Sequence, residues 1–138
     1  MVEALPMTDA QDPDVERAMA LLGPLEGRVM RAVWTGEVTE TFVVRDVQIL
    51  MPQLAYTTVM TTLRRLADKG LLTAKAEPGR RAHDYRAAGT ATDYLARASH
   101  DEAAQFVARY GDAALSAFAA RLADLTPEQR RRLEDLPQ

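Results

Sequence analysis

Residues 55–70, AYTTVMTTLRRLADKG, decide the fold, because one helix drawn through them has two faces of different chemistry. At about 100° per residue, one side gathers apolar residues, namely Val59, Leu63 and Leu66 flanked by Met60 and Ala67. The other side gathers Thr57, Thr58, Thr61, Arg65 and Lys69. Threonine brings a hydroxyl and a methyl, and arginine a forked donor, which are groups that contact base edges and phosphates in the major groove of DNA. The stretch therefore predicts a recognition helix; the alternative is an ordinary surface helix, since exposed threonine and arginine are common.

A β-hairpin is predicted directly after this helix. Gly70 is the usual residue type past a helix C-terminus, and residues 71–75 then have the character of a strand. Pro and Gly within 77–80 supply a turn, and residues 81–86 return as a second strand. Arg80 and Arg81 at the tip would reach a phosphate or the minor groove beside the helix, unless the tip is only a solvated loop.

Upstream, Gly23 and Pro24 predict the start of another helix, because Pro is favoured at the first helical position. Its apolar stripe consists of Leu25, Val29, Ala32 and Val33, with Trp34 beside it as a core residue. Gly36 ends this helix.

Residues 41–44 are apolar and β-branched enough for a short strand, and residues 45–51 predict a brief second helix that buries Val47 and Leu50. Pro52 closes that helix, so that 52–55 form the turn before the recognition helix. Three helices followed by a basic-tipped hairpin predict a winged helix-turn-helix.

The last third of the chain predicts three more helices. Thr92 and Asp93 start the first, Gly111 and Asp112 restart the chain, and Thr126 to Gln129 form a capping box that opens the last. Short amphipathic helices with alanine-rich surfaces suit a two-fold interface better than a fold-back onto the winged domain. The residues predicted to form a dimer interface are Leu95, Phe106, Tyr110, Leu115, Phe118, Leu122, Leu125 and Leu133.

The predicted fold class is therefore mainly α, a winged helix-turn-helix of three helices and a small antiparallel β-wing, with a C-terminal α-helical dimerisation region. We divide the chain into an acidic, partly flexible N-terminal tail at 1–21, a winged-helix DNA-binding domain at 22–88 and a helical dimerisation region at 89–138. Within the tail, residues 14–21 are compatible with a short helix leading into the core.

The net charge of −3 conceals a concentrated positive region. Residues 22–88 hold ten basic against seven acidic side chains, a net of +3, while 1–21 carry −4 and 89–138 carry −2. Between 56 and 86 the balance is seven against three, and a dimer doubles that excess. The predicted DNA-contacting residues are Thr57, Thr58, Thr61, Arg64, Arg65, Lys69, Arg80 and Arg81.

Composition narrows the function further. The sequence has no cysteine, and its two histidines, His83 and His100, lack metal-ligand spacing, so no metal site and no cofactor are expected. No nucleophile, base and orienting acid cluster at a readable spacing, so no catalytic residue is predicted. No apolar run of about eighteen residues and no basic-then-apolar leader occurs, which predicts a cytoplasmic protein without membrane insertion.

Four motifs together resemble the penicillinase-repressor family of winged-helix proteins (BlaI, MecI and CopY types). They are LGPLEGRVMRAVW at 22–34, VRDV at 44–47, YTTVMTTLRRLADKGLL at 56–72 and GRRAHDY at 79–85. The resemblance covers roughly residues 22–136 and implies a homodimeric repressor of a palindromic operator on double-stranded DNA, with TACA/TGTA-type half-sites. It places the base-contacting threonines at Thr58 and Thr61, the recognition-helix arginine at Arg65, and a wing arginine at Arg80 or Arg81. The copper-responsive branch uses a C-terminal cysteine cluster, which this sequence lacks.

The resemblance also implies a release mechanism. Members carry a scissile Asn-Phe bond in the helical region that is cut after a membrane-bound metalloprotease senses a β-lactam. The matching dipeptide is Gln105-Phe106, which keeps the amide on a longer side chain. It is the candidate cleavage site; the alternatives are another site, another signal, and a Phe106 that serves only in the dimer core.

Two other function classes stay open at this point. One is a ligand-sensing winged-helix regulator of the MarR type, although the longer wing of that type is missing. The other is a winged-helix protein-interaction module without a DNA role.

Overall fold

The computed structural model describes residues 12–76, 78–79 and 83–136. The chain divides into two compact units, one reaching to Arg97 and the other from Ala98 onward. We call them the winged unit and the C-terminal unit, and describe each by itself. No described helix is both long and apolar enough to cross a membrane.

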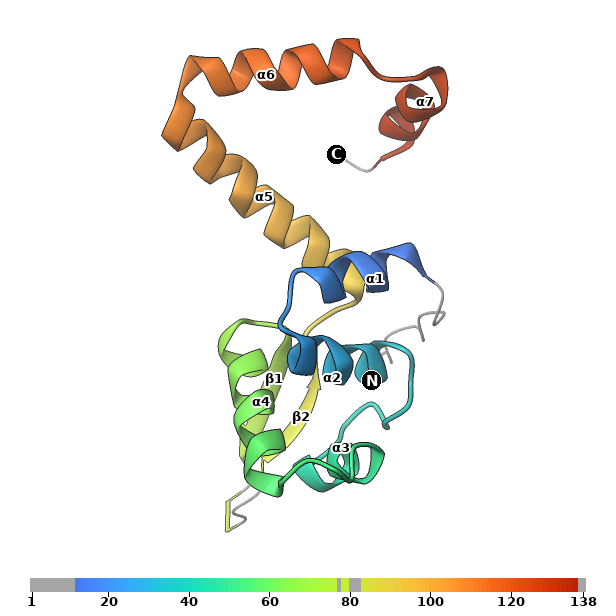
Figure 1. Cartoon of the computed structure of the whole chain (residues 1–138), viewed down its shortest axis with the longest axis vertical. Coiled ribbons are helices and arrows are strands. Elements are labelled where there is room, and N and C mark those ends of the chain that lie inside the picture. The colour runs from blue at the N-terminus through green and yellow to red at the C-terminus, as the bar shows by residue number, and fades with distance from the viewer. Residues whose placement is uncertain (1–11, 77, 80–82, 137–138) are drawn as a thin grey trace. The chain divides into compact units, whose positions relative to one another are not determined.

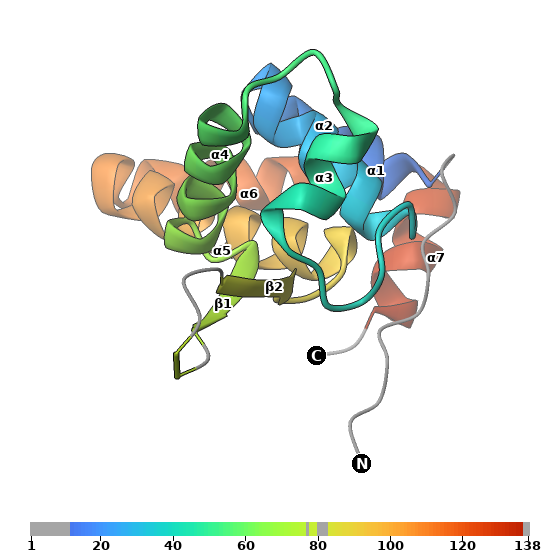
Figure 2. The ribbon, with the colours of Figure 1, turned by 90° about the horizontal axis from the view of Figure 1, so that it is seen from below.

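The winged unit combines helices with a small hairpin, as predicted (Figure 1). Its elements are α1 (Pro13–Ala20), α2 (Pro24–Trp34), α3 (Val44–Leu50), α4 (Tyr56–Asp68), β1 (Leu72–Ala76), β2 (His83–Ala87) and the first turns of α5 (Ala91–Tyr110). Strands β1 and β2 are antiparallel, with Leu72 opposite Ala87 and Ala76 opposite His83. Helix α4 lies beside α3 and beside the hairpin (Figure 2).

Helix boundaries follow the predicted signals. Helix α2 begins with Pro24 after an N-cap at Gly23. Helix α4 ends at Asp68, and Gly70 then adopts a φ of 83°, a left-handed conformation that glycine reaches without steric cost.

The core of the winged unit lies between the helices and the hairpin. Val59, Leu63 and Leu66 of α4 are buried as the helical pattern predicts. Trp34 is also buried, and its indole N–H donates to the Gly89 carbonyl oxygen at 3.1 Å. Other large, fully buried side chains include Val15, Val29, Met30, Phe42, Val47 and Leu72.

The strand predicted at 41–44 is reduced to one bridge. Phe42 pairs with Tyr85 of β2 through two backbone hydrogen bonds of 2.9 and 2.7 Å, and α3 already starts at Val44. The predicted strand was too long, because β-branched residues can also form part of a helix when their side chains pack in the core. Val44 is itself buried in the first turn of α3.

The prediction that α3 buries Leu50 was also wrong. Val47 is fully buried, but Leu50 is 40% exposed, and Met51 is buried at 4% exposure in its place. Val44, Val47 and Met51 are spaced i, i+3 and i+7 and share one face, whereas Leu50 lies about 100° round the helix from Met51. In a helix this short, a rotation about its axis equivalent to one residue decides which side chain reaches the core.

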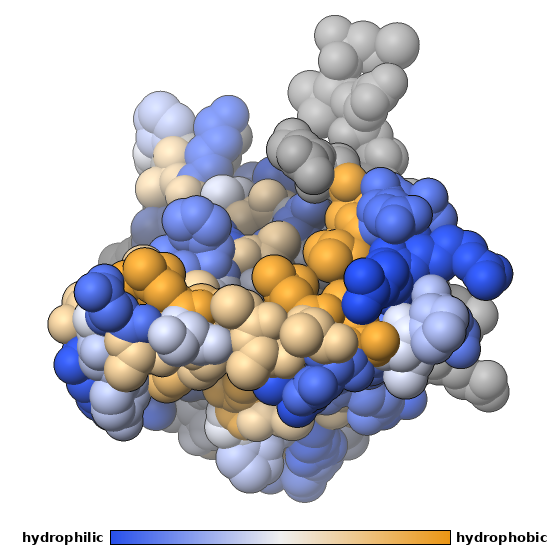
Figure 3. Space-filling model, turned by 90° about the horizontal axis from the view of Figure 1, so that it is seen from above, coloured by the Kyte–Doolittle hydropathy of each residue, from blue (hydrophilic) through white to orange (hydrophobic). Residues whose placement is uncertain are grey.

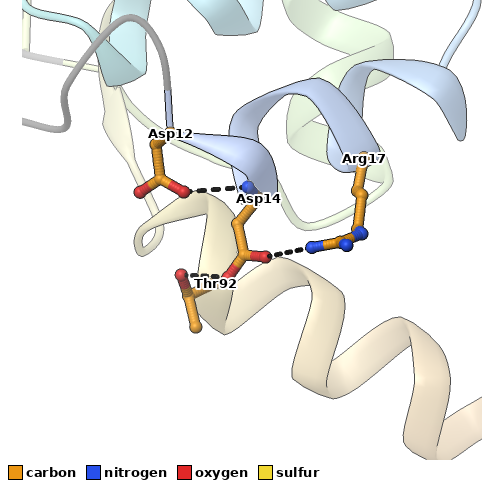
Figure 4. Close-up of polar contacts among 4 residues, drawn as sticks. All are labelled: Asp12, Asp14, Arg17 and Thr92. Atoms are coloured by element: carbon orange, nitrogen blue, oxygen red, sulfur yellow. Dashed lines mark hydrogen bonds and ion pairs between the residues drawn. The ribbon is translucent and has the colours of Figure 1, made fainter.

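Helix α1 belongs to the winged unit, and it begins one residue before the short helix anticipated at 14–21. Val15 and Ala18 are buried in the shared core. Figure 4 shows its polar attachments: the Asp12 carboxylate accepts from the Asp14 N–H, and Asp14 accepts from the Thr92 hydroxyl at 2.7 Å and pairs with Arg17. The rest of the tail predicted at 1–21, residues 1–11, lies outside the described residues.

The C-terminal unit contains the end of α5, then α6 (Asp112–Ala123) and α7 (Pro127–Asp135), as predicted. Gly111, with a φ of 59°, separates α5 from α6, and Thr126 with Gln129 forms the predicted capping box. Large apolar side chains remain exposed, and Figure 3 shows such hydrophobic residues among hydrophilic ones. They are Phe106, Tyr110, Leu115, Phe118, Leu122, Leu133 and Leu136.

Candidate nucleic-acid interface

The outer face of α4 carries short hydroxyls and guanidinium groups. Thr57, Thr58, Thr61, Arg64 and Arg65 are all exposed, while the opposite face of the helix is packed into the core. Thr58, Thr61 and Arg65 are spaced i, i+3 and i+7, so they share one side over two turns. The arrangement predicted from helical periodicity is therefore present in the structure.

The N-terminal end of α4 is open. Its N-cap, Ala55, makes no side-chain capping hydrogen bond, which leaves the first-turn N–H groups available at the positive end of the helix dipole. Such an end binds phosphate oxygens readily.

Thr62 differs from the other threonines of α4. It is buried, and its hydroxyl donates to the Thr58 carbonyl oxygen at 2.8 Å. Its polar atom is thus satisfied within the helix and does not compete for a ligand.

The Arg64 guanidinium lies close enough to β2 for its charge to affect the Tyr85 phenol. Burial raises the pKa of the Tyr85 phenol above its ordinary 10.0, and the nearby Arg64 guanidinium acts in the opposite direction. Tyr85 stays neutral at physiological pH, and Arg64 remains exposed.

Lys69 at the C-terminal end of α4 has a partner within the fold. Its ammonium lies 2.8 Å from a carboxylate oxygen of Glu26 on α2, whose side chain is mostly buried. The structure thus gives Lys69 a role in joining α4 to α2, and its contact with DNA stays a prediction.

The predicted wing residues Arg80 and Arg81 lie outside the described residues. Around them, the strands β1 and β2 keep a regular register, and Gly79 has a φ of 82°, as a tight turn requires.

The penicillinase repressor family model matches residues 22–138. The chain belongs to the penicillinase repressor family. Its members are DNA-binding transcriptional repressors rather than enzymes. The match begins at Leu22 and so leaves α1 in front of it. A search of curated proteins found no match.

Two candidate contacts of this repressor were missed in the sequence. Tyr56, the first residue of α4, is 42% exposed beside the open helix end. Arg45 on α3 is exposed next to the turn that contains Pro52, and no ion pair holds it among the described residues. Both lie in motifs quoted for the family resemblance, so the signal was present, but a one-helix periodicity argument does not include α3 or the first helical position.

The predicted dimer residues of the repressor fall into two groups. Leu95 belongs to the winged unit and packs against its core, unlike the others. In the C-terminal unit the Phe106 ring lies 4.9 Å from the Tyr110 ring and 5.4 Å from the Phe118 ring, measured between centroids. Tyr110, Leu115, Phe118, Leu122 and Leu133 are exposed, as is Phe106, and Leu125 is partly buried.

The candidate cleavage residues Gln105 and Phe106 are exposed within the regular helix α5. A protease needs an extended backbone, so cleavage here requires local unfolding of the helix. In the described part of the chain, no group of His, Asp and Glu side chains could hold a metal ion.

Proposed function

We propose that this repressor acts in the cytoplasm as a homodimer on a palindromic operator with TACA/TGTA-type half-sites. Each protomer places α4 in one major groove, where Thr58 and Thr61 contact bases and Arg65 binds a base or a phosphate. The observation that carries the proposal is the outer face of α4, with two exposed threonines and an exposed guanidinium on one side of a helix whose other side is core.

Phosphate contacts surround this centre in the proposed complex. We propose that the N-terminus of α4, Arg45 of α3 and the wing arginines Arg80 and Arg81 supply these contacts. These contacts position the protein on DNA and carry no sequence information themselves.

The dimer is supported by the exposed apolar side chains of the C-terminal unit. Soluble monomers seldom leave so many large apolar residues in contact with water, and a two-fold partner would bury them. Two recognition helices held about one DNA turn apart then match a palindrome.

Substitution of Arg65 tests the DNA contact. We expect Arg65→Ala and Thr61→Ala each to cost about 1–3 kcal/mol of operator binding, measured by fluorescence anisotropy on a palindromic duplex with TACA/TGTA-type half-sites, while dimerisation stays unchanged. Arg17→Ala is the matched control, because it removes the same charge from α1 with only an exposed ion pair to Asp14. If Arg65→Ala and Arg17→Ala lost the same operator affinity, the loss would reflect a nonspecific effect of charge and not a contact made by Arg65.

We further propose that cleavage between Gln105 and Phe106, by a membrane-bound metalloprotease responding to a β-lactam or another cell-wall signal, releases the operator. A cut there would separate Phe106, Phe118 and Leu122 from the winged unit and so remove the proposed dimer contacts. Mass spectrometry of the repressor in induced cells tests this. An intact chain during derepression would refute it.

A further inference from the structure

The first two turns of α5 hold the C-terminal end of the recognition helix. The Arg97 guanidinium donates to the Gly70 carbonyl oxygen at 3.0 Å. The last carbonyls of a helix have no partner within it and carry partial negative charge, so a guanidinium is a suitable cap just beyond α4. A Cβ on Gly70 would lie 3.3 Å from this guanidinium, so glycine permits the close approach.

Arg97 lies over one aromatic ring, which in turn contacts a second. Its Cζ lies 5.8 Å from the centroid of the Tyr94 ring, a cation–π distance. The Tyr94 ring centroid in turn lies 6.3 Å from that of Trp34 of α2, whose indole N–H donates to the carbonyl oxygen of Gly89, two residues before α5. We call Trp34, Gly70, Tyr94 and Arg97 the α5 anchor; all four belong to the winged unit.

The start of α5 is fixed independently of Arg97. The Thr90 N–H donates to the Asp93 carboxylate, and the Asp93 N–H donates to the Thr90 hydroxyl, at 2.9 and 3.1 Å. Thr92 adds its hydrogen bond to Asp14 of α1. The position of the helix start is therefore secured by α1, and the contact with Gly70 ties the second turn to α4.

We propose that Arg97 is a positioning residue that sets the direction of α5 relative to the recognition helix, and through it the operator half-site spacing that the dimer accepts. This inference rests on the proposed function. Arg97 does not itself contact DNA in it, because its guanidinium is engaged at Gly70.

The length of α5 makes this direction matter. The helix runs without interruption from Ala91 to Tyr110, so about 20 Å of helix lies beyond Arg97 at about 1.5 Å per residue. A tilt of roughly 10° at the anchor moves the far end by roughly 3.5 Å, close to the ~3.4 Å rise of one base pair. Loss of the anchor should therefore reduce the difference in affinity between operators whose half-site separations differ by one base pair.

The experiment measures operator affinity by fluorescence anisotropy at one salt concentration, with duplexes whose half-site separation varies by one or two base pairs around the best one. We expect the wild type to prefer one spacing by about tenfold or more, the size of effect that a single mismatched pair produces. Arg97→Met should reduce this preference to about threefold or less. Arg97→Lys should restore part of it, because an ammonium still reaches a carbonyl oxygen and a ring face.

Arg109→Met is the matched control, since it removes an exposed arginine from the last turn of the same helix. Tyr94→Leu is a second variant that removes the ring under Arg97 and should change the preference in the same direction by a smaller factor. Sedimentation of each variant checks that the dimer is retained.

The outcomes separate the two proposals. A wild type that binds no palindromic duplex overturns the proposed function. A wild type with a clear spacing preference that Arg97→Met and Tyr94→Leu both retain overturns the positioning role and leaves the proposed function standing. A flattened preference in Arg97→Met, restored in part by Arg97→Lys and absent from Arg109→Met, supports it.

Discussion

Similar apolar residues are buried in the winged unit and exposed in the C-terminal unit. Phe42 of the winged unit is 1% exposed, whereas Phe106 and Phe118 of the C-terminal unit are 37% and 39% exposed. In the described part of the C-terminal unit, Ala114 is the fully buried apolar residue, and the leucines of α6 and α7 face solvent. The first unit completes its core within one chain. In the proposed function, a second chain covers the exposed apolar residues of the second unit.

The largest expected effect follows from removing a ring from the completed core. Phe42→Ala should cost about 3–5 kcal/mol of the unfolding free energy of the winged unit, because the cavity beside Tyr85 cannot close fully. Urea unfolding followed by the fluorescence of Trp34, the one tryptophan of the sequence, reports on this unit. The loss should be the same at low and high protein concentration.

Phe106→Ala provides the matched control for that comparison. It removes the same ring from an exposed site, so the Trp34 transition should move little. If Phe106→Ala destabilised the winged unit as much as Phe42→Ala, the two units would not be independent in their cores.

A smaller effect is expected from a pair of leucines that are equally exposed in the two units. Leu122 of α6 is 51% exposed and Leu21, just after α1, is 52% exposed. If the dimer covers Leu122, Leu122→Ala should weaken dimerisation by about 1–2 kcal/mol for each copy, because half of the side chain is already buried, whereas Leu21→Ala should leave it unchanged. Sedimentation equilibrium measures both. Equal dimer dissociation constants would remove the difference that we draw between the units.

The contrast between the units also explains how far the sequence could be interpreted. The helices α2, α4, α5, α6 and α7 and the hairpin were predictable, because periodicity, glycine stops and caps such as Thr126 act within a few neighbouring residues. The outer face of α4 was predictable for the same reason. Leu50 and the strand at 41–44 were not, because burial in α3 depends on how the helix is rotated against α4.

Long-range contacts account for the remaining differences. The Lys69–Glu26 ion pair and the Arg97–Gly70 hydrogen bond join residues 43 and 27 positions apart, and no local pattern marks either pair. The same holds for Leu95, whose apolar character is equally compatible with a dimer interface and with the winged core that it contacts. A side chain's chemistry was predictable, but its partner depended on the tertiary structure.

The smallest expected effect concerns the cap of α7, which tests how far the C-terminal unit is a cooperative unit. The Thr126 hydroxyl accepts from the Gln129 N–H at 3.1 Å, and the Gln129 side chain accepts from the Thr126 N–H at 3.0 Å. Thr126→Ala should cost about 1 kcal/mol, seen as a lower circular-dichroism midpoint with an unchanged Trp34 transition. Ser116→Ala, which removes an exposed hydroxyl within α6, should cause no loss, because alanine is the better helix former. A shift of the Trp34 transition in Thr126→Ala would instead mean that α7 stabilises the winged unit, and the contrast between a self-sufficient unit and a partner-dependent one would fail.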